Sequence, residues 1–138
     1  MKVLIDTSVW SLAFRKSEKT ESEVGIIEFL SELIRDTNVI IIGPIRQEIL
    51  SGISVKSKFD ELKSKLSIFK DQQLFSKDHE LAAEYYNLCR SKGIQGSHID
   101  FLICAFAINN DYAILTLDKD FPNYKKYIPI KTMKIESV

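Results

Sequence analysis

Four acidic residues stand where the ends of buried elements are expected. Asp6 ends the apolar run 2–5, and Asp118 ends the apolar run 112–117. Glu48 lies about one turn into the helix expected after a second apolar run, and Asp100 lies in the first turn of an apolar helix. In an open parallel sheet, the carboxyl ends of the strands and the starts of the following helices share one edge, where ligands bind. We therefore expect these four carboxylates to converge.

Converging carboxylates point to metal chemistry. Two carboxylates about 6 Å apart repel by roughly 3 kcal/mol at an effective dielectric of about 20, so a bound cation would offset a large cost. Oxygen ligands favour Mg²⁺ or Mn²⁺, whereas zinc prefers histidine or cysteine. The chain has only two histidines, His79 and His98. Hard divalent ions in carboxylate sites commonly activate water and stabilise a leaving oxygen, which predicts hydrolysis of a phosphodiester.

Each acid also has a structural interpretation, which the sequence alone leaves open. Asp6 can cap the following helix, and Asp118 can be a turn residue. Asp100 stands three residues after Ser97, which is a capping pattern. Glu48 can be a solvated surface acid. Four such acids at the ends of buried elements are a less common coincidence than any one of them.

The elements that position these acids follow from hydrophobic patterning. The chain of 138 residues is 45% hydrophobic and 28% charged, which suits a single domain over residues 1–138. Short apolar runs alternate with amphipathic segments, which predicts an α/β fold around a central parallel sheet flanked by helices. The expected strands are 2–5, 39–42, 112–117 and 128–133. The expected helices are 7–14, 23–35, 44–50, 55–69, 77–91 and 97–109.

Charge and cysteine content narrow the function classes. The 19 basic and 19 acidic residues balance, so no broad basic field attracts nucleic acid, and a local site is required. The two cysteines, Cys89 and Cys104, are too few for a disulfide framework and lie among apolar residues of expected helices, where they suit the core. No export signal and no membrane-length apolar run is visible, so we expect a cytoplasmic protein.

Four basic residues lie near the expected acidic edge. They are Arg15, Lys16, Arg46 and Lys119. Such side chains can bind the phosphates of a nucleic acid strand. Solvated surface charge is the competing interpretation of each. We treat Arg46 and Lys119 as candidate substrate-binding residues.

Four segments in order resemble the PIN domain, and more narrowly the VapC-type toxins of toxin–antitoxin pairs. The segments read V-L-I-D-T-S-V-W, P-I-R-Q-E-I-L-S-G, H-I-D-F-L-I-C-A-F-A-I and I-L-T-L-D-K-D-F. The resemblance covers essentially the whole chain. It implies a Rossmann-like α/β/α sandwich and a Mg²⁺- or Mn²⁺-dependent ribonuclease. It also implies a homodimer that a cognate antitoxin keeps inactive by occupying the cleft.

The resemblance assigns further roles. Asp6, Glu48, Asp100 and Asp118 match the family's acidic ligands. Thr7 matches a small polar residue after the first acid, Thr116 matches a hydroxyl residue at the end of the last strand before the fourth acid, and Asp120 matches a variable additional acid. The glycine-rich segment 92–97 lacks the proline common there.

Missing acids disfavour a phosphatase and a receiver, while a nuclease of RNA maturation and a non-catalytic module remain as alternatives. A haloacid dehalogenase-type phosphatase would need an acid where this chain has Ser8. A response-regulator receiver would need paired acids after the first strand and a phosphoacceptor after a middle one. A PIN-type nuclease of RNA maturation or decay would share the same acids, while a non-catalytic metal- or RNA-binding module would be expected to lose some of them.

Overall fold

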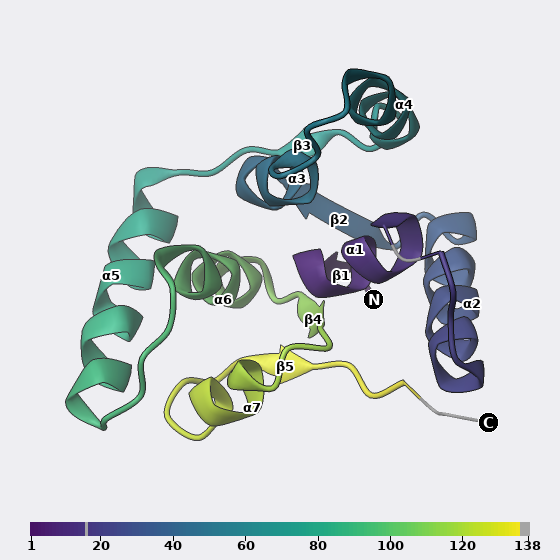
Figure 1. Cartoon of the computed structure of the whole chain (residues 1–138). Helices are drawn as coiled ribbons and strands as arrows, with labels where there is room; N and C mark the ends of the chain where they lie inside the picture. The colour runs from purple at the N-terminus through teal and green to yellow at the C-terminus, as the bar shows by residue number, and fades with distance from the viewer. Residues whose placement is uncertain (16, 136–138) are drawn as a thin grey trace.

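The computed structural model describes residues 1–15 and 17–135. Its sheet is parallel throughout, with the strand order β3-β2-β1-β4-β5 (Figure 1). The strands in the described part of the chain are β1 (Val3–Ile5), β2 (Val39–Ile42), β3 (Asp71–Gln72), β4 (Ala113–Leu115) and β5 (Lys131–Thr132). The chain order reverses beside β1, which has β2 on one side and β4 on the other. This reversal is the position at which open α/β sheets bind ligands.

Helices connect the strands and cover the sheet. Figure 1 shows α5 and α6 on one side of the sheet and α2 on the other. In the described residues the helices are α1 (Thr7–Arg15), α2 (Glu21–Arg35), α3 (Gly43–Leu50), α4 (Lys56–Leu66), α5 (Ser76–Ser91), α6 (His98–Asn110) and α7 (Asp120–Lys125). The α/β sandwich predicted from the sequence is therefore confirmed.

The core is built around the central strands and α6. All three residues of β1 are fully buried, and residues 101–107 of α6 are all buried. Cys89 and Cys104 are buried as free thiols, as predicted. Burial raises the pKa of both thiols above the ordinary value for cysteine, which keeps them protonated. Both cysteines therefore serve packing.

Two short elements were not predicted, and several limits differ. β3 has two residues and α7 has six, both too short for a periodic signal. The helix predicted over 55–69 spans only Lys56–Leu66. The apolar repeat extended the prediction beyond it, because Phe69 in the following turn is also packed, with its ring 5.1 Å from that of Trp10. The strands predicted over 112–117 and 128–133 are shorter, at 113–115 and 131–132. Within the described residues, no helix is both long and apolar enough to cross a bilayer.

Candidate active site

Asp6 lies where β1 and β4 end side by side. Its backbone N–H donates to the carbonyl of Leu115 at 2.9 Å, which joins the two strand ends. Its carboxylate oxygen Oδ2 accepts hydrogen bonds from Ser8 Oγ at 2.8 Å and Thr116 Oγ1 at 2.7 Å. Asp6 is 5% exposed, and these hydroxyl groups offset part of the cost of burying its charge.

The same two hydroxyl groups fix the turn that follows β4. Ser8 Oγ accepts a hydrogen bond from the N–H of Leu117, and Thr116 Oγ1 accepts one from the N–H of Asp118, each at 3.0 Å. Asp118 in turn accepts the N–H of Asp120 at 2.9 Å, where α7 begins. The first and fourth predicted acids are thus connected by a chain of hydrogen bonds. Ser8 was not predicted as a site residue, because its contact with the turn after β4 joins positions 109 apart in the sequence.

Three carboxylates form a compact cluster. One oxygen each of Asp100, Asp118 and Asp120 lies within 4.8 Å of the others. Asp100 and Asp118 are half-buried and Asp120 is exposed. Three carboxylate oxygens at this spacing fit a hard divalent ion, which prefers several oxygen ligands. Asp120, which the resemblance gave only as an additional acid, is therefore part of the cluster.

The pKa of Asp100 is raised above the ordinary value for aspartate. Burial raises its pKa, a hydrogen bond from the Tyr124 hydroxyl at 2.7 Å opposes that rise, and the charges of Asp118 and Asp6 raise it further. The predicted cap at the start of α6 is present: Ser97 Oγ accepts a hydrogen bond from the backbone N–H of Asp100 at 3.0 Å. This cap does not use the Asp100 carboxylate. The Asp100 carboxylate remains directed to the acidic cluster.

Glu48 lies at the margin of the site. Its Oε1 accepts a hydrogen bond from Thr7 Oγ1 at 2.8 Å, and Thr7 directly follows Asp6. Glu48 is half-buried on α3 and is not one of the three clustered acids. The structure therefore links Glu48 to the site through Thr7. His98 stacks on Tyr86 with ring centroids 4.7 Å apart and is also outside the cluster.

Arg46 has structural contacts that occupy its guanidinium group. Its Nε donates to Asp71 at 2.9 Å, Nη1 donates to the carbonyl of Leu66 at 3.0 Å, and Nη2 donates to the carbonyl of Phe69. These bonds attach the segment between α4 and β3 to α3. Arg46 therefore has a structural role at this junction.

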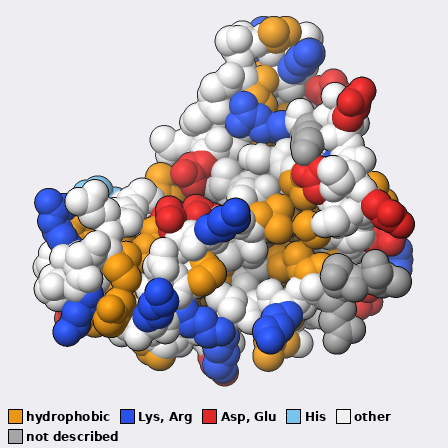
Figure 2. Space-filling view, turned by 60° about the horizontal axis from the view of Figure 1, so that its bottom comes forward, with side chains coloured by type: hydrophobic (Ala, Val, Ile, Leu, Met, Phe, Trp, Pro, Cys, Tyr) orange, Lys and Arg blue, Asp and Glu red, His pale blue; other side chains and the backbone are white. Residues whose placement is uncertain are grey.

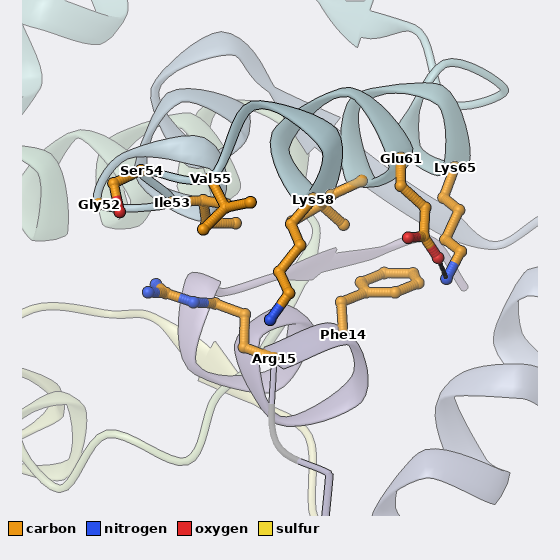
Figure 3. A pocket seen from close by; sticks show the side chains of 10 residues that line it. Phe14, Arg15, Gly52, Ile53, Ser54, Val55, Lys58, Glu61 and Lys65 are labelled. Atoms are coloured by element: carbon orange, nitrogen blue, oxygen red, sulfur yellow. Dashed lines mark ion pairs between the residues drawn. The ribbon is translucent and has the colours of Figure 1, made fainter.

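The other basic candidates differ in position. Lys119 is exposed and lies between two of the clustered acids in the sequence. Arg15 lines a separate cavity of about 450 Å³ between α1 and α4, together with Phe14, Lys58 and Leu62 (Figure 3). Lys16 falls outside the described residues. Figure 2 shows acidic side chains grouped near the centre of one face, beside a hollow and a basic side chain.

The sequence profile of the PIN domain matches residues 3–127. This chain belongs to the PIN domain family. Proteins of this family are typically metal-dependent nucleases, and the acidic cluster lies where the sheet order reverses. No curated protein matched the chain.

Solved structures show the same fold at low sequence identity. FitAcB from Neisseria gonorrhoeae superposes with a TM-score of 0.76 at 16% identity, covering 99% of each chain. VapBC2 from Rickettsia felis, bound to a DNA fragment from its promoter, gives a TM-score of 0.77 at 20% identity and covers 96% of this chain and 98% of that one. FitAB bound to an IR36 DNA fragment gives 0.73 at 18%, with coverages of 95% and 93%. The likeness spans the whole PIN domain.

Proposed function

We propose that this PIN domain is a Mg²⁺- or Mn²⁺-dependent endoribonuclease. The observation that carries the proposal is the cluster of Asp100, Asp118 and Asp120, with carboxylate oxygens within 4.8 Å of one another at the reversal of a parallel sheet. Such a cluster is costly without a cation and suits one with oxygen ligands. Asp6 adds a fourth carboxylate, whose charge acts on Asp100.

In this proposal, some site residues bind the metal ion and another orients the attacking water. Asp6, Asp100 and Asp118 would bind the metal, with Asp120 as a further ligand. A divalent ion bound there supplies an activated water and stabilises the charge of the leaving oxygen. Glu48, oriented by Thr7, would accept a hydrogen bond from the attacking water.

Lys119 and Thr116 complete this assignment. The exposed ammonium group of Lys119 would contact a phosphate of the RNA strand. Thr116 fixes the Asp6 carboxylate and the turn before α7.

Removal of single carboxylates tests the proposal. Asp6→Asn, Asp100→Asn and Asp118→Asn should each reduce cleavage of a labelled single-stranded RNA by at least about a hundredfold, because each removes one metal-ligand charge. Asp60→Asn is the matched control, since Asp60 pairs with Lys56 on the surface of α4. Chelation by EDTA should abolish cleavage and Mn²⁺ should restore it. Cleavage that persists in all three variants would reject the nuclease assignment.

We further propose that the protein is the toxin of a toxin–antitoxin pair. Support comes from the likeness to FitAB and VapBC2 and from the cavity between α1 and α4. The apolar lining of this cavity includes Phe14, Ile53 and Val55, and Arg15 and Lys58 extend into it without an ion pair in the described part of the chain (Figure 3). An antitoxin segment with apolar and acidic side chains would complement this surface.

Expression provides the test of the biological role. The protein alone should arrest growth, and co-expression of the product of an adjacent small gene should relieve the arrest. Lys58→Glu should weaken that relief while RNA cleavage in vitro is retained, whereas Lys126→Glu, at the end of α7 and away from the cavity lining, should leave relief intact. Normal growth on expression of active enzyme would contradict the toxin role. Light scattering tests the homodimer that the resemblance implies.

A further inference from the structure

We propose that Tyr124 is a positioning residue for the Asp100 carboxylate, and that Gly96 provides the space that this contact needs. The inference rests on the proposed function, because it concerns how Asp100 would be presented to a metal ion. The Tyr124 hydroxyl donates to Asp100 Oδ2 at 2.7 Å. Because this bond uses one oxygen of the carboxylate, it fixes the orientation of the group while the second oxygen can face a metal ion.

The Tyr124 side chain is held rigidly. It is fully buried, and its ring packs against Phe101 at 4.8 Å and against Phe121 at 5.3 Å. Phe101 belongs to α6 and Phe121 to α7, so the packing fixes the position of the Tyr124 hydroxyl relative to α6, the helix that carries Asp100. A buried ring between two aromatic neighbours has few alternative rotamers.

Gly96 lies directly against this ring. A Cβ atom at position 96 would lie 2.8 Å from Cζ of Tyr124 and 2.8 Å from Cε2 of Phe101, and it would clash with the Tyr124 hydroxyl oxygen. The backbone of Gly96 does not adopt a positive φ angle, so glycine is required here for space and not for conformation. The segment before α6 therefore makes room for the hydroxyl group.

Helix α7 carries both a clustered acid and the hydroxyl group that orients another acid. It begins at Asp120, a member of the acidic cluster, and carries Tyr124 one turn later. One short helix thus supplies a carboxylate to the cluster and the hydroxyl that orients a second carboxylate. Residues that hydrogen-bond to metal ligands commonly change metal affinity 10–100-fold when they are removed.

Metal binding provides the direct test. Tyr124→Phe in the full-length protein should weaken Mn²⁺ binding, measured by titration calorimetry, roughly tenfold or more. The matched control is Tyr112→Phe, which removes a hydroxyl that donates to Gln72 at 3.1 Å. Tyr112 precedes β4, whereas Asp118 follows it. The control should bind Mn²⁺ within about twofold of the parent, since its partner is not a proposed ligand.

A second readout separates positioning from stability. If Tyr124 acts through the metal, higher Mn²⁺ concentrations should restore RNA cleavage by Tyr124→Phe. Gly96→Ala should weaken Mn²⁺ binding in the same direction, and it should weaken it less in the Tyr124→Phe background, where the hydroxyl is already gone. A lower melting temperature with an unchanged Mn²⁺ dissociation constant in both single variants would overturn the inference.

The outcomes also separate this inference from the function on which it rests. Wild-type protein that fails to bind Mn²⁺, or an Asp100→Asn variant that binds it as well as wild type, would overturn the metal site and the role of Tyr124 together. Loss of binding in Asp100→Asn with full binding in Tyr124→Phe would overturn only the role of Tyr124.

Discussion

Neutralising Asp118, one of the three clustered acids, should stabilise the metal-free protein. Asp118 lies within 4.8 Å, oxygen to oxygen, of both Asp100 and Asp120. Unit charges at that separation repel by about 3 kcal/mol at an effective dielectric of about 20. Water around the exposed Asp120 and the half-buried Asp118 screens this repulsion, which reduces it to about 1 kcal/mol for each pair. Asp118→Asn removes both pairs, a gain of about 2 kcal/mol.

The change leaves the local hydrogen bond in place. The amide side chain introduced by Asp118→Asn would still offer its carbonyl oxygen to the N–H of Asp120, the bond that Asp118 makes at 2.9 Å. For a domain of this size, about 2 kcal/mol corresponds to a rise in melting temperature of roughly 5–10 °C. The assay is thermal unfolding followed by circular dichroism, first in EDTA and then across a Mg²⁺ titration. Mg²⁺ should raise the melting temperature of the parent more than that of the variant.

A charge-matched control excludes a general effect of net charge. Glu32→Gln removes one exposed acid of α2, and it should change the free energy of unfolding by less than about 0.5 kcal/mol. An Asp118→Asn variant that melts below the parent in EDTA would refute the reasoning. It would mean that this carboxylate stabilises its turn more than its neighbours repel it.

Three further perturbations address the surroundings of the cluster. Because the pKa of Asp100 is raised in the folded state, its ionisation destabilises the metal-free fold. As the pH falls from neutral toward the ordinary pKa of 3.8, the parent should therefore gain stability relative to Asp100→Asn. Melting temperatures of the two proteins that change in parallel across that pH range would contradict this. Thr116→Val should lower the free energy of unfolding by about 1–3 kcal/mol and reduce RNA cleavage, because the Asp6 carboxylate loses a hydrogen-bond donor. Thr116→Ser should retain both properties, and urea denaturation and cleavage rates check this. Asp78→Ala should cost about 1–3 kcal/mol in urea denaturation while leaving Mn²⁺ affinity unchanged, because buried Asp78 accepts from Asn109 at 2.8 Å and so joins α5 to α6 away from the acids.

The sequence predicts the fold well where the signal is local. The buried strands β1 and β2 are short apolar runs that end at polar or glycine residues, and α6 is apolar around its whole circumference. Their alternation with amphipathic helices is enough to predict a parallel sheet. β3 and α7 are too short to show a hydrophobic period. Pro122 lies in the first turn of α7, where proline is tolerated, but in the sequence a proline argues against a helix.

The proximity of Asp100 and Asp118 could be predicted because the topology brings their positions together, whereas Glu48 lies outside the cluster. Their partners could not, since these come from contacts between distant segments. The hydroxyl of Tyr124 reaches Asp100 across 24 positions of sequence, and Thr116 reaches Asp6 across 110. The contacts of Arg46 show the same limit, because its hydrogen bonds to the backbone carbonyls of Leu66 and Phe69 depend on packing that the sequence does not show.

The placement of the acids explains how the fold tolerates their repulsion. Asp6 directly follows β1, whose three residues are fully buried, and Asp100 precedes the buried stretch 101–107 of α6. These two carboxylates are therefore attached to buried elements of the core. Asp118 and Asp120 lie instead on the turn into the short helix α7, which is tied down by hydroxyl groups and by the buried ring of Tyr124. Both parts of the site are thus held in place by contacts that do not depend on an ion, so a divalent ion would find the carboxylates already close together.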